Sequence, residues 1–329
     1  MSSRECPTVS IVTPVLNQGQ FIEQAIQSVR GQEYSNLEHI VVDGGSSDST
    51  LSILERYEGT YNMRWISEPD NGMYQAINKG MRKAKGEIFA YLNADDLYLP
   101  WTLRTVVEEF QRKPSADLVY GDMVNMAMNG QYASIIFNPP KRALRTHLRF
   151  LSLAQPVVFW RRRVFESLEG FDESLQIASD YDFWLNAASR FRFEKVDEIL
   201  AIFRFHSDSK SLRSMADLKE ETALVTARYH GQNSTRRVAE QLLYELLWAR
   251  YHTARLFLLY TKRAFDRSEG EAWYHLLHTK ALLDVSIWEL CATFIPGLTC
   301  AIMRGNPDFG EGHIDANRLL QIAIASAGF

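Results

Sequence analysis

Residues 87–96 read Glu-Ile-Phe-Ala-Tyr-Leu-Asn-Ala-Asp-Asp, an apolar run that ends abruptly in polar side chains. The run up to Leu92 has the length and composition of a buried strand. Asn93, Asp95 and Asp96 follow it directly. In open α/β sheets, ligands bind beyond the carboxyl ends of the strands. We therefore predict an α/β fold with a functional site at this edge of the sheet.

The segment before this strand alternates short apolar runs with helical patterns. Strands are expected over residues 8–14, ending at Pro14, over 40–42 and over 63–67. Strands that alternate with helices through short turns predict a mostly parallel sheet flanked by helices. Helices are expected where apolar side chains recur three and four residues apart: at Ile22, Ala25, Ile26 and Val29; at Leu51, Leu54 and Tyr57; and at Met73, Ala76, Ile77, Gly80 and Met81.

The adjacent carboxylates Asp95 and Asp96 allow two interpretations. Neighbouring carboxylates repel unless a cation or positive donors lie between them. Oxygen ligands in an open turn suit Mg²⁺ or Mn²⁺, which can bridge the oxygens of a diphosphate. Alternatively, the pair caps a helix that begins near Pro100. The motif alone leaves both interpretations open.

The composition excludes several classes of protein. The chain has 329 residues with 36 Lys+Arg and 40 Asp+Glu, and the net charge of −4 argues against a nucleic-acid partner. Three scattered cysteines are too few for a disulfide framework or a zinc cluster. The first residues have no apolar signal segment. We expect a cytoplasmic protein, with association at the inner face of the membrane left open.

The charge pattern changes after residue 122. Residues 123–165 contain no Asp or Glu. This basic stretch suits either a solvated surface or a cradle for an anionic, lipid-linked acceptor or an anionic membrane face. The basic side chains of the stretch are Lys141, Arg142, Arg145, Arg149, Arg161, Arg162 and Arg163.

Further on, residues 195–205 are expected to form paired short strands that end at His206.

The β pattern disappears after about residue 208. We predict a boundary near residue 212, with an α/β domain over residues 1–212 and an all-helical appendage over residues 213–329. The aromatic residues of the appendage have helical spacing and are expected in its core. A homo-oligomer contact or a membrane-surface helix around Ile287–Ile302 is the alternative.

Four ordered motifs carry a resemblance to a known family. They are Val9-Ser-Ile-Val-Thr-Pro-Val-Leu-Asn17, Val41-Val-Asp-Gly-Gly-Ser-Ser-Asp-Ser-Thr50, Glu68-Pro-Asp-Asn-Gly-Met-Tyr-Gln-Ala-Ile-Asn-Lys-Gly80 and Gly86-Glu-Ile-Phe-Ala-Tyr-Leu-Asn-Ala-Asp-Asp96. Together they resemble the family 2 glycosyltransferases over about residues 8–210. The resemblance implies a GT-A-like fold, a UDP-sugar or other nucleotide-sugar donor, a divalent cation (Mn²⁺ or Mg²⁺) and inversion at the anomeric carbon.

The resemblance also implies roles for individual residues on the donor side. Asp43 matches the acid that hydrogen-bonds the base, although Gly44 stands where the family often has a second acid. Asn93 stands where the family commonly has the first Asp of its metal motif, so Asp95 takes most of that expectation. His206 lies in a segment similar to the family's Arg-x-His ending. The implied nucleotide-sugar site is Pro14, Asn17, Asp43, Asp70, Lys79, Asn93 and Asp95, and the implied metal ligands are Asp95, Asp96 and His206.

An acceptor hydroxyl that attacks an anomeric carbon must lose its proton, and a nearby carboxylate can take it. Three motifs together are similar to the family's acceptor segment, which ends in its catalytic acid: Gln155-Pro-Val-Val-Phe-Trp160, Gly170-Phe-Asp-Glu173 and Ser179-Asp-Tyr-Asp-Phe-Trp-Leu185. By position that acid is Asp180, with Asp182 as the second choice. As an alternative, both carboxylates stabilise the start of a helix.

The resemblance implies a saccharide or lipid-linked saccharide acceptor, in surface polysaccharide or glycolipid assembly. Two other functions stay open. A nucleotidyltransferase also uses acidic metal ligands on an α/β sheet, but Pro14-Val-Leu-Asn-Gln-Gly19 is a poor phosphate loop. A catalytically silent, sugar-nucleotide-binding scaffold would fit the departures at Gly44, Asn93 and Ser179.

Overall fold

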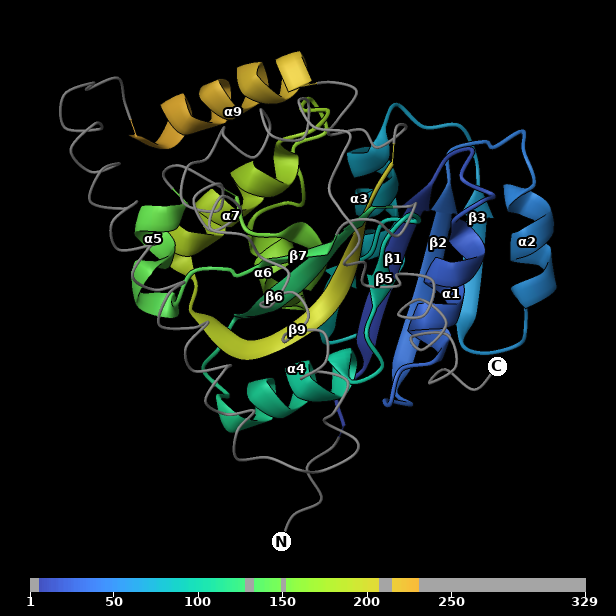
Figure 1. The fold of residues 1–329 in the computed structure, drawn as a ribbon, viewed down its shortest axis with the longest axis horizontal. Helices are drawn as coiled ribbons and strands as arrows, with labels where there is room; N and C mark the ends of the chain where they lie inside the picture. Colours follow the sequence, from blue (N-terminus) through green and yellow to red (C-terminus); the bar gives the residue numbers. More distant parts are fainter. Residues whose placement is uncertain (1–5, 128–132, 149–151, 207–214, 231–329) are drawn as a thin grey trace, which may run out of the picture.

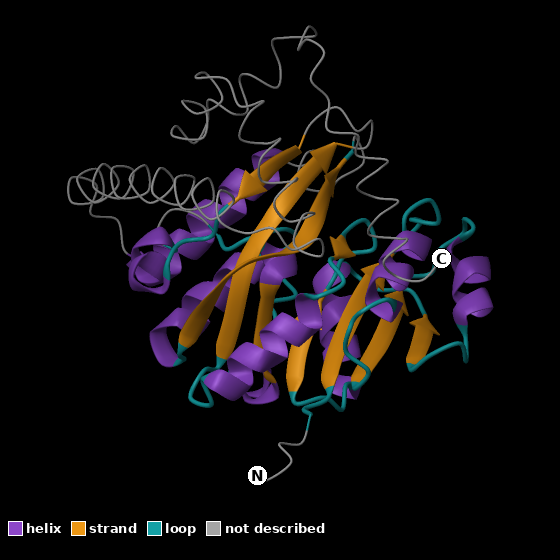
Figure 2. Ribbon diagram, turned by 60° about the horizontal axis from the view of Figure 1, so that its bottom comes forward, coloured by secondary structure: helices purple, strands orange, loops and turns teal. Residues whose placement is uncertain are grey.

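The computed structural model describes residues 6–127, 133–148, 152–206 and 215–230 (Figure 1). Within them, nine strands form one sheet in the order β3-β2-β1-β4-β8-β6-β9-β5, with β7 paired to β6. Helices cover both faces of the sheet (Figure 2). The predicted α/β class is confirmed.

The first half of the sheet has the predicted alternation of strands and helices. The strands β1 to β4 pair in parallel. Their bounds are β1 Val9–Val15, β2 Leu37–Asp43, β3 Met63–Ser67 and β4 Ile88–Tyr91, and the helices between them are α1 Ile22–Arg30, α2 Thr50–Tyr57 and α3 Met73–Lys83.

The first strand was predicted to end at Pro14, but it continues to Val15. The pairing of β1 with β4 stops at Val12, whose carbonyl accepts the Leu92 N–H. Because alternate residues of a strand bond to opposite neighbours, the missing N–H of Pro14 falls on the side where the ladder with β4 has ended. Pro14 is therefore tolerated within the strand.

Antiparallel pairs enter in the second half of the sheet, where β8 pairs with β4 and β6, and β5 pairs with β9. The strands are β5 Leu97–Tyr98, β6 Leu118–Ala127, β7 Ala133–Ile136, β8 Val158–Arg161 and β9 Phe193–Phe205. The helices are α4 Thr102–Arg112, α5 Leu144–His147, α6 Arg162–Ser167, α7 Ser179–Arg190 and α9 Met215–His230, with 3₁₀ turns at Lys141–Ala143 and Gln155–Val157.

The prediction of paired short strands over residues 195–205 is wrong. The chain forms the single thirteen-residue strand β9, which runs beside β6 (Figure 1). Its register against β6 shifts on both sides of Asp122. These irregularities let one long strand follow its neighbour without a turn.

Two main apolar clusters lie on opposite faces of the sheet. One joins alternate residues of β1, β2 and β4 to α3, α6 and α7, with the fully buried rings of Trp160 and Trp184 at its centre. The other joins the intervening strand residues to α1 and α4. Burial of this much apolar surface fixes the strand ends relative to one another.

Helix α9 lies beyond the predicted boundary at residue 212 but packs on α7 (Figure 1). Its Val225 is fully buried in the first apolar cluster. The remainder of the predicted helical appendage, residues 231–329, lies outside the described residues, as does the Ile287–Ile302 segment. None of the helices within the described ranges combines the length and hydropathy of a membrane span.

Candidate functional site

The strand order places most of the predicted donor-site residues at one edge of the sheet. Strand β1 lies between β2 and β4, and the register pairs Val15 with Asp43. Asn17 follows β1, and Asn93 to Asp96 follow β4. Because these strands are parallel, their carboxyl ends meet at the same edge. Sequence-distant loops thus share one surface.

Asp95 and His206 meet at this edge. The Oδ2 atom of Asp95 lies 3.0 Å from the Nε2 atom of His206. The side chains are only 14% and 7% exposed, respectively. The His206 ring also stacks at a tilt on Phe21, with 4.4 Å between the ring centroids. A carboxylate and an imidazole held together in this way are suitable ligands for a divalent cation.

Arg204 holds the loop that carries Asp95. Its guanidinium donates to the main-chain carbonyl of Asp95 and to the side-chain carbonyl of Gln24, and it lies over the Phe21 ring at 5.1 Å. Antiparallel pairing of β5 with β9 sets this contact, because extending the register from Leu97 and Ile202 brings Asp95 opposite Arg204. Burial lowers the pKa of Arg204 to about 10.

The sequence interpretation did not assign Arg204 to the site. Arg204 could have been recognised as a charged residue in the otherwise apolar run Ile199–Phe205, two positions before His206. A buried guanidinium needs several acceptors. An arginine within an apolar strand therefore indicates a nearby loop whose main-chain carbonyls can accept its hydrogen bonds.

Asp96 is buried in the protein and is not part of the Asp95–His206 contact. It is fully buried, and its Oδ1 accepts the main-chain N–H of Arg204 at 3.2 Å. Burial, and then the charge of Asp95, raise the pKa of Asp96 well above its usual value. The helix-cap interpretation of the acidic pair is wrong, because β5 intervenes and α4 begins only at Thr102, where no side chain caps it.

Asn17 and Asp43 connect the two loops that follow β1 and β2. Asn17 has a positive φ of 52°; its N–H donates to Ser46 Oγ at 2.7 Å, and its side-chain oxygen accepts the Ser47 N–H at 2.8 Å. The Asp43 carboxylate is fully buried and accepts hydrogen bonds from Gly45, Ser46 and Ser67. Asp43 therefore shapes the loop in this structure.

Asp70 lies beside Gly44. A Cβ atom built on Gly44 would be only 2.8 Å from the Asp70 Oδ2 atom. The second acid that the family often carries after Asp43 is absent from the sequence at that position. The Asp70 carboxylate, from the loop that follows β3, lies directly beside Gly44. Asp70 is the acid that a glycine at position 44 leaves room for.

Lys79 lies on α3 and makes an ion pair from that helix. Its ammonium pairs with Glu68 at 2.9 Å. Both residues line a shallow hollow together with Arg82 and Glu173. Pro14 is buried within β1 and shapes the strand end rather than facing solvent.

Asn93 contacts the segment that precedes β8. Its side-chain amide donates to Gln155 Oε1 at 3.4 Å, and Gln155 in turn donates to the Tyr91 carbonyl at 2.8 Å. The buried Oδ1 atom of Asn93 has no hydrogen-bond partner among the described residues. Gln155, the first residue of the predicted acceptor segment, thus ties that segment to the end of β4.

Asp180 and Asp182 lie on different sides of α7. Asp180 faces Tyr74, with its Oδ1 atom 3.5 Å from the phenol oxygen, and it accepts the Tyr181 N–H at 2.7 Å. Burial raises the pKa of Asp180 to about 7. Asp182 instead pairs with Arg228 of α9 at 3.1 Å. Of the two, the Asp180 environment is the one typical of a general base.

The arginines of the basic stretch divide into two groups. Arg161, Arg162 and Arg163 bind the Ala116 carbonyl, the Gly86 carbonyl and the Asp117 carboxylate, respectively. They brace the protein and do not form a cradle. Arg142 and Arg145 are exposed, whereas Arg149 lies outside the described residues.

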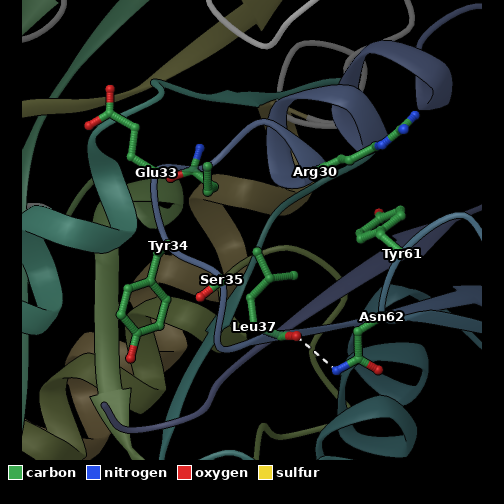
Figure 3. Close-up of a pocket in the computed structure, with 8 residues that line it drawn as sticks. Arg30, Glu33, Tyr34, Ser35, Leu37, Tyr61 and Asn62 are labelled. Atoms are coloured by element: carbon green, nitrogen blue, oxygen red, sulfur yellow. Dashed lines mark hydrogen bonds between the residues drawn. The ribbon is translucent and has the colours of Figure 1, made fainter.

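A separate hollow of about 510 Å³ lies at the amino end of β2 (Figure 3). Leu37, the first residue of β2, lines it together with Arg30, Tyr34 and Tyr61. The carboxyl ends of the parallel strands lie at the opposite edge of the sheet. This hollow is therefore distinct from the site built around Asp95 and Asp180.

Comparisons of the sequence with known proteins find a matching family and several relatives. A sequence model of the family described as Glycosyl transferase family 2 matches residues 10–168. Chondroitin synthase of Escherichia coli is 28% identical over 219 residues, which make up 66% of this chain and 32% of that protein. Hyaluronan synthase of Pasteurella multocida is 26% identical over 220 residues, or 67% of this chain and 22% of that protein. The chain spans about a third or less of the length of these relatives.

Solved structures resemble the whole fold. Staphylococcus aureus TarS 1-349 in complex with UDP matches with a TM-score of 0.55 and 17% identity, over 97% of this chain and 88% of that one. The mannosyltransferase PcManGT from Pyrobaculum calidifontis, in complex with GDP-Man and Mn²⁺, matches with a TM-score of 0.54 and 19% identity, over 92% and 88%. This likeness confirms the GT-A-like fold.

Proposed function

Because the chain belongs, over residues 10–168, to glycosyl transferase family 2, we propose that it transfers a sugar from a nucleotide-sugar donor to an acceptor hydroxyl. The observation that carries the proposal is the contact between Asp95 and His206 at 3.0 Å, at the carboxyl edge of the sheet. UDP is the nucleotide we expect, since the fold resembles a protein solved with UDP and with UDP-GlcNAc.

The Asp95–His206 pair fits a divalent cation. Two ligand atoms at neighbouring corners of an octahedral Mg²⁺ or Mn²⁺ site, each about 2.1 Å from the ion, are about 3.0 Å apart. The atoms of this pair have that separation. No group of three His, Cys, Asp or Glu side chains suited to a metal occurs among the described residues, so we propose that donor phosphates and water supply the other ligands.

Asp96 takes a different part in this proposal from the one expected from the sequence. Its buried carboxylate accepts the main-chain N–H of Arg204 through Oδ1. We propose that Asp96 supports the loop, while Asp95 and His206 provide the protein ligands of the cation. A cation bound by Asp95 and His206 would stabilise the negative charge of the departing nucleoside diphosphate. The imidazole ligand favours Mn²⁺ over Mg²⁺.

On the donor side, Asn17 and Asp70 supply exposed or partly exposed polar groups around the loop after β2. We propose that Asp70, beside Gly44, contacts the base or ribose, and that Asp43 keeps the loop in shape. The exposed side chain of Leu16, 52% accessible at the end of β1, offers an apolar surface beside these polar groups. A nucleoside needs both kinds of contact.

We propose that Asp180 accepts the proton of the attacking hydroxyl. The acceptor oxygen forms a bond to the anomeric carbon as the bond from that carbon to the diphosphate oxygen breaks. The bonding electron pair leaves with the nucleoside diphosphate, and the proton moves to an Asp180 oxygen. A single displacement of this kind inverts the anomeric centre. A carboxyl group with a pKa near 7 is suited to this transfer at neutral pH.

A saccharide or lipid-linked saccharide is the acceptor we propose, in polysaccharide or glycolipid assembly, since the relatives include chondroitin and hyaluronan synthases. The exposed Arg142 and Arg145 would contact its anionic part. Reversing both charges should abolish transfer to a phospholipid-linked acceptor but spare donor hydrolysis. If transfer and hydrolysis both survive, the arginines do not bind the acceptor.

The proposed activity is tested by nucleotide release from a panel of UDP- and GDP-sugars with Mn²⁺. We expect slow release from one donor by the natural chain, and at least a hundredfold slower release by the Asp180→Asn variant. Binding of the nucleotide without any release, in all conditions, would instead favour the silent scaffold. Failure to bind any nucleotide would contradict the proposal.

A further inference from the structure

A carboxylate from α9 binds the chain just before α7. Glu221 accepts the main-chain N–H groups of Gln176 at 2.7 Å, Ile177 at 2.8 Å and Ala178 at 2.9 Å. Ala178 itself provides no side-chain cap to the helix. Three hydrogen bonds to one charged group make a strong and directional anchor. The two residues that follow are Ser179 and Asp180.

The main chain of Ile177 is held on both sides of its Cα atom. Its N–H donates to Glu221, and its carbonyl accepts the hydroxyl of Tyr74 at 2.6 Å. The same Tyr74 oxygen lies 3.4 Å from the Asp180 nitrogen and 3.5 Å from the Asp180 Oδ1 atom. Glu221 of α9, Ile177 and Tyr74 of α3 therefore form a continuous chain of contacts that ends at Asp180.

The direction in which the Tyr74 hydroxyl donates its proton affects the stability of the ionised Asp180 carboxylate. A phenol has one proton to donate. At 2.6 Å the Ile177 carbonyl is the much closer acceptor, so Tyr74 directs its proton there. The Asp180 carboxylate then keeps the Tyr181 N–H as its short hydrogen bond. If Ile177 moved away, the Tyr74 hydroxyl would turn to Asp180 and stabilise the ionised carboxylate.

We propose that Glu221 is a positioning residue for Asp180, acting through the main chain of Ile177 and the Tyr74 hydroxyl. The role assigned to Asp180 rests on the proposed function, but the contacts themselves do not. Glu221 lies outside residues 10–168, so the segment that matches the family does not contain it. Helix α9 thus completes the candidate active site, and the predicted boundary at residue 212 would divide it.

Other charged and titratable groups surround Asp180 on each packed element. Tyr74 of α3 and Tyr91 of β4 both interact electrostatically with it. Asp182 and Arg228 pair with each other on a different side of α7. Of the groups on α9, Glu221 is the one whose carboxylate binds the chain that leads into Asp180.

The test begins with a titration that needs no substrate. The Asp180 carboxyl carbon is followed by NMR in the full-length protein, with its signal assigned by the Asp180→Asn variant. In Glu221→Gln, which has one acceptor oxygen in place of two, we expect the proton affinity of Asp180 to fall about threefold or more. Glu220→Gln removes the same charge from an exposed position of the same helix and should leave the titration unchanged.

The route through Tyr74 is tested with Tyr74→Phe. Because this variant removes the hydroxyl, adding Glu221→Gln to it should change the Asp180 titration no further. An equal change in both backgrounds would show that Glu221 acts by its charge alone and would overturn the proposal. Glu221→Asp keeps the charge but shortens the reach, so it replaces Glu221→Gln if that variant does not fold. An unchanged titration in every folded Glu221 variant would also overturn the proposal.

Turnover then separates positioning from stability. In Glu221→Gln we expect kcat to fall about tenfold, with KM for the donor changed less than twofold. A lowered melting temperature with wild-type kcat would leave Glu221 a merely structural role and contradict the proposal. If the natural chain turns over no donor while the titration responds as expected, the positioning contact stands and the proposed function fails.

Discussion

Asp95 and His206 are 111 positions apart in the chain, yet their Oδ2 and Nε2 atoms lie 3.0 Å from each other. The short strand β5 explains this proximity. It leaves the Asp95 loop and pairs at once with β9, the strand that ends next to His206. Arg204 then fastens the loop by donating to the Asp95 carbonyl. The pair is therefore built by the fold and does not depend on a long, unsupported loop.

The two carboxylates of α7 should separate in function. Asp180→Asn should lower kcat at least a hundredfold, because the general base is lost. Its melting temperature at pH 8 should not fall, since the buried charge is removed with it. Asp182→Asn breaks a partly exposed ion pair with Arg228, worth about 1 kcal/mol or less, and should keep kcat within a few-fold. The reverse pattern would make Asp182 the base.

The rate should depend on pH through Asp180. Burial raises the pKa of this carboxyl from 3.8 to about 7. The base must be ionised, so kcat/KM should fall about tenfold for each pH unit below about 7 and become constant above it. The same pKa shift means that the folded protein binds the Asp180 proton more tightly than the unfolded chain. The contribution of Asp180 to the free energy of unfolding therefore declines as the pH rises from 3.8 to about 7. A rate that stays constant down to pH 5.5 would contradict the assignment.

The sequence predicted the parallel half of the sheet well, because β1, β2 and β4 are apolar runs followed at once by polar loops. It did not predict β9 as one strand. Charged residues along that strand, such as Glu194 and Lys195, interrupt its alternation. They form ion pairs with Lys141 of a 3₁₀ turn and with Asp122 of the neighbouring strand β6, respectively. Local patterns do not reveal pairing partners that lie far along the chain.

Site prediction from sequence has the same limit. Asp95, His206 and Asp180 stand out because each lies in a segment that resembles the family pattern, next to a predicted strand or helix. Arg204 and Glu221 do not, because their importance comes from main-chain groups that they bind on other segments. The proximity of Asp70 to Gly44 is likewise hidden in the sequence, because the two residues belong to different loops.

Arg204→Lys should weaken both the fold and the site. Lysine keeps the charge but loses the planar fork that reaches the Asp95 carbonyl and Gln24 together. We expect a loss of about 2–3 kcal/mol of unfolding free energy from denaturation curves. Nucleotide affinity in the remaining folded protein should fall as the Asp95 loop loosens. Arg82→Lys, at an exposed ion pair on α3, is the matched control and should change neither quantity.

Gly80 should be required for the packing of α3 on the sheet. A Cβ atom at this position would lie 2.6 Å from the Val12 Cγ1 atom and 3.2 Å from the Val42 Cγ2 atom. Gly80→Ala is therefore expected to destabilise the protein by about 1–3 kcal/mol in chemical denaturation. Lys83→Ala, at an exposed position of the same helix, should stay within about 0.5 kcal/mol of the natural protein. Equal stabilities for the two variants would show that α3 can shift away from β1.

The central claim is that Asp95 and His206 bind a nucleoside diphosphate through a divalent cation. Calorimetry of UDP binding, with Mn²⁺ and with EDTA, tests it most directly in the natural chain, Asp95→Asn and His206→Ala. We predict binding that requires Mn²⁺ and weakens at least tenfold in each variant, while the exposed-site control Glu220→Gln binds normally. UDP binding of equal strength with EDTA, or unchanged binding in both site variants, would contradict the account.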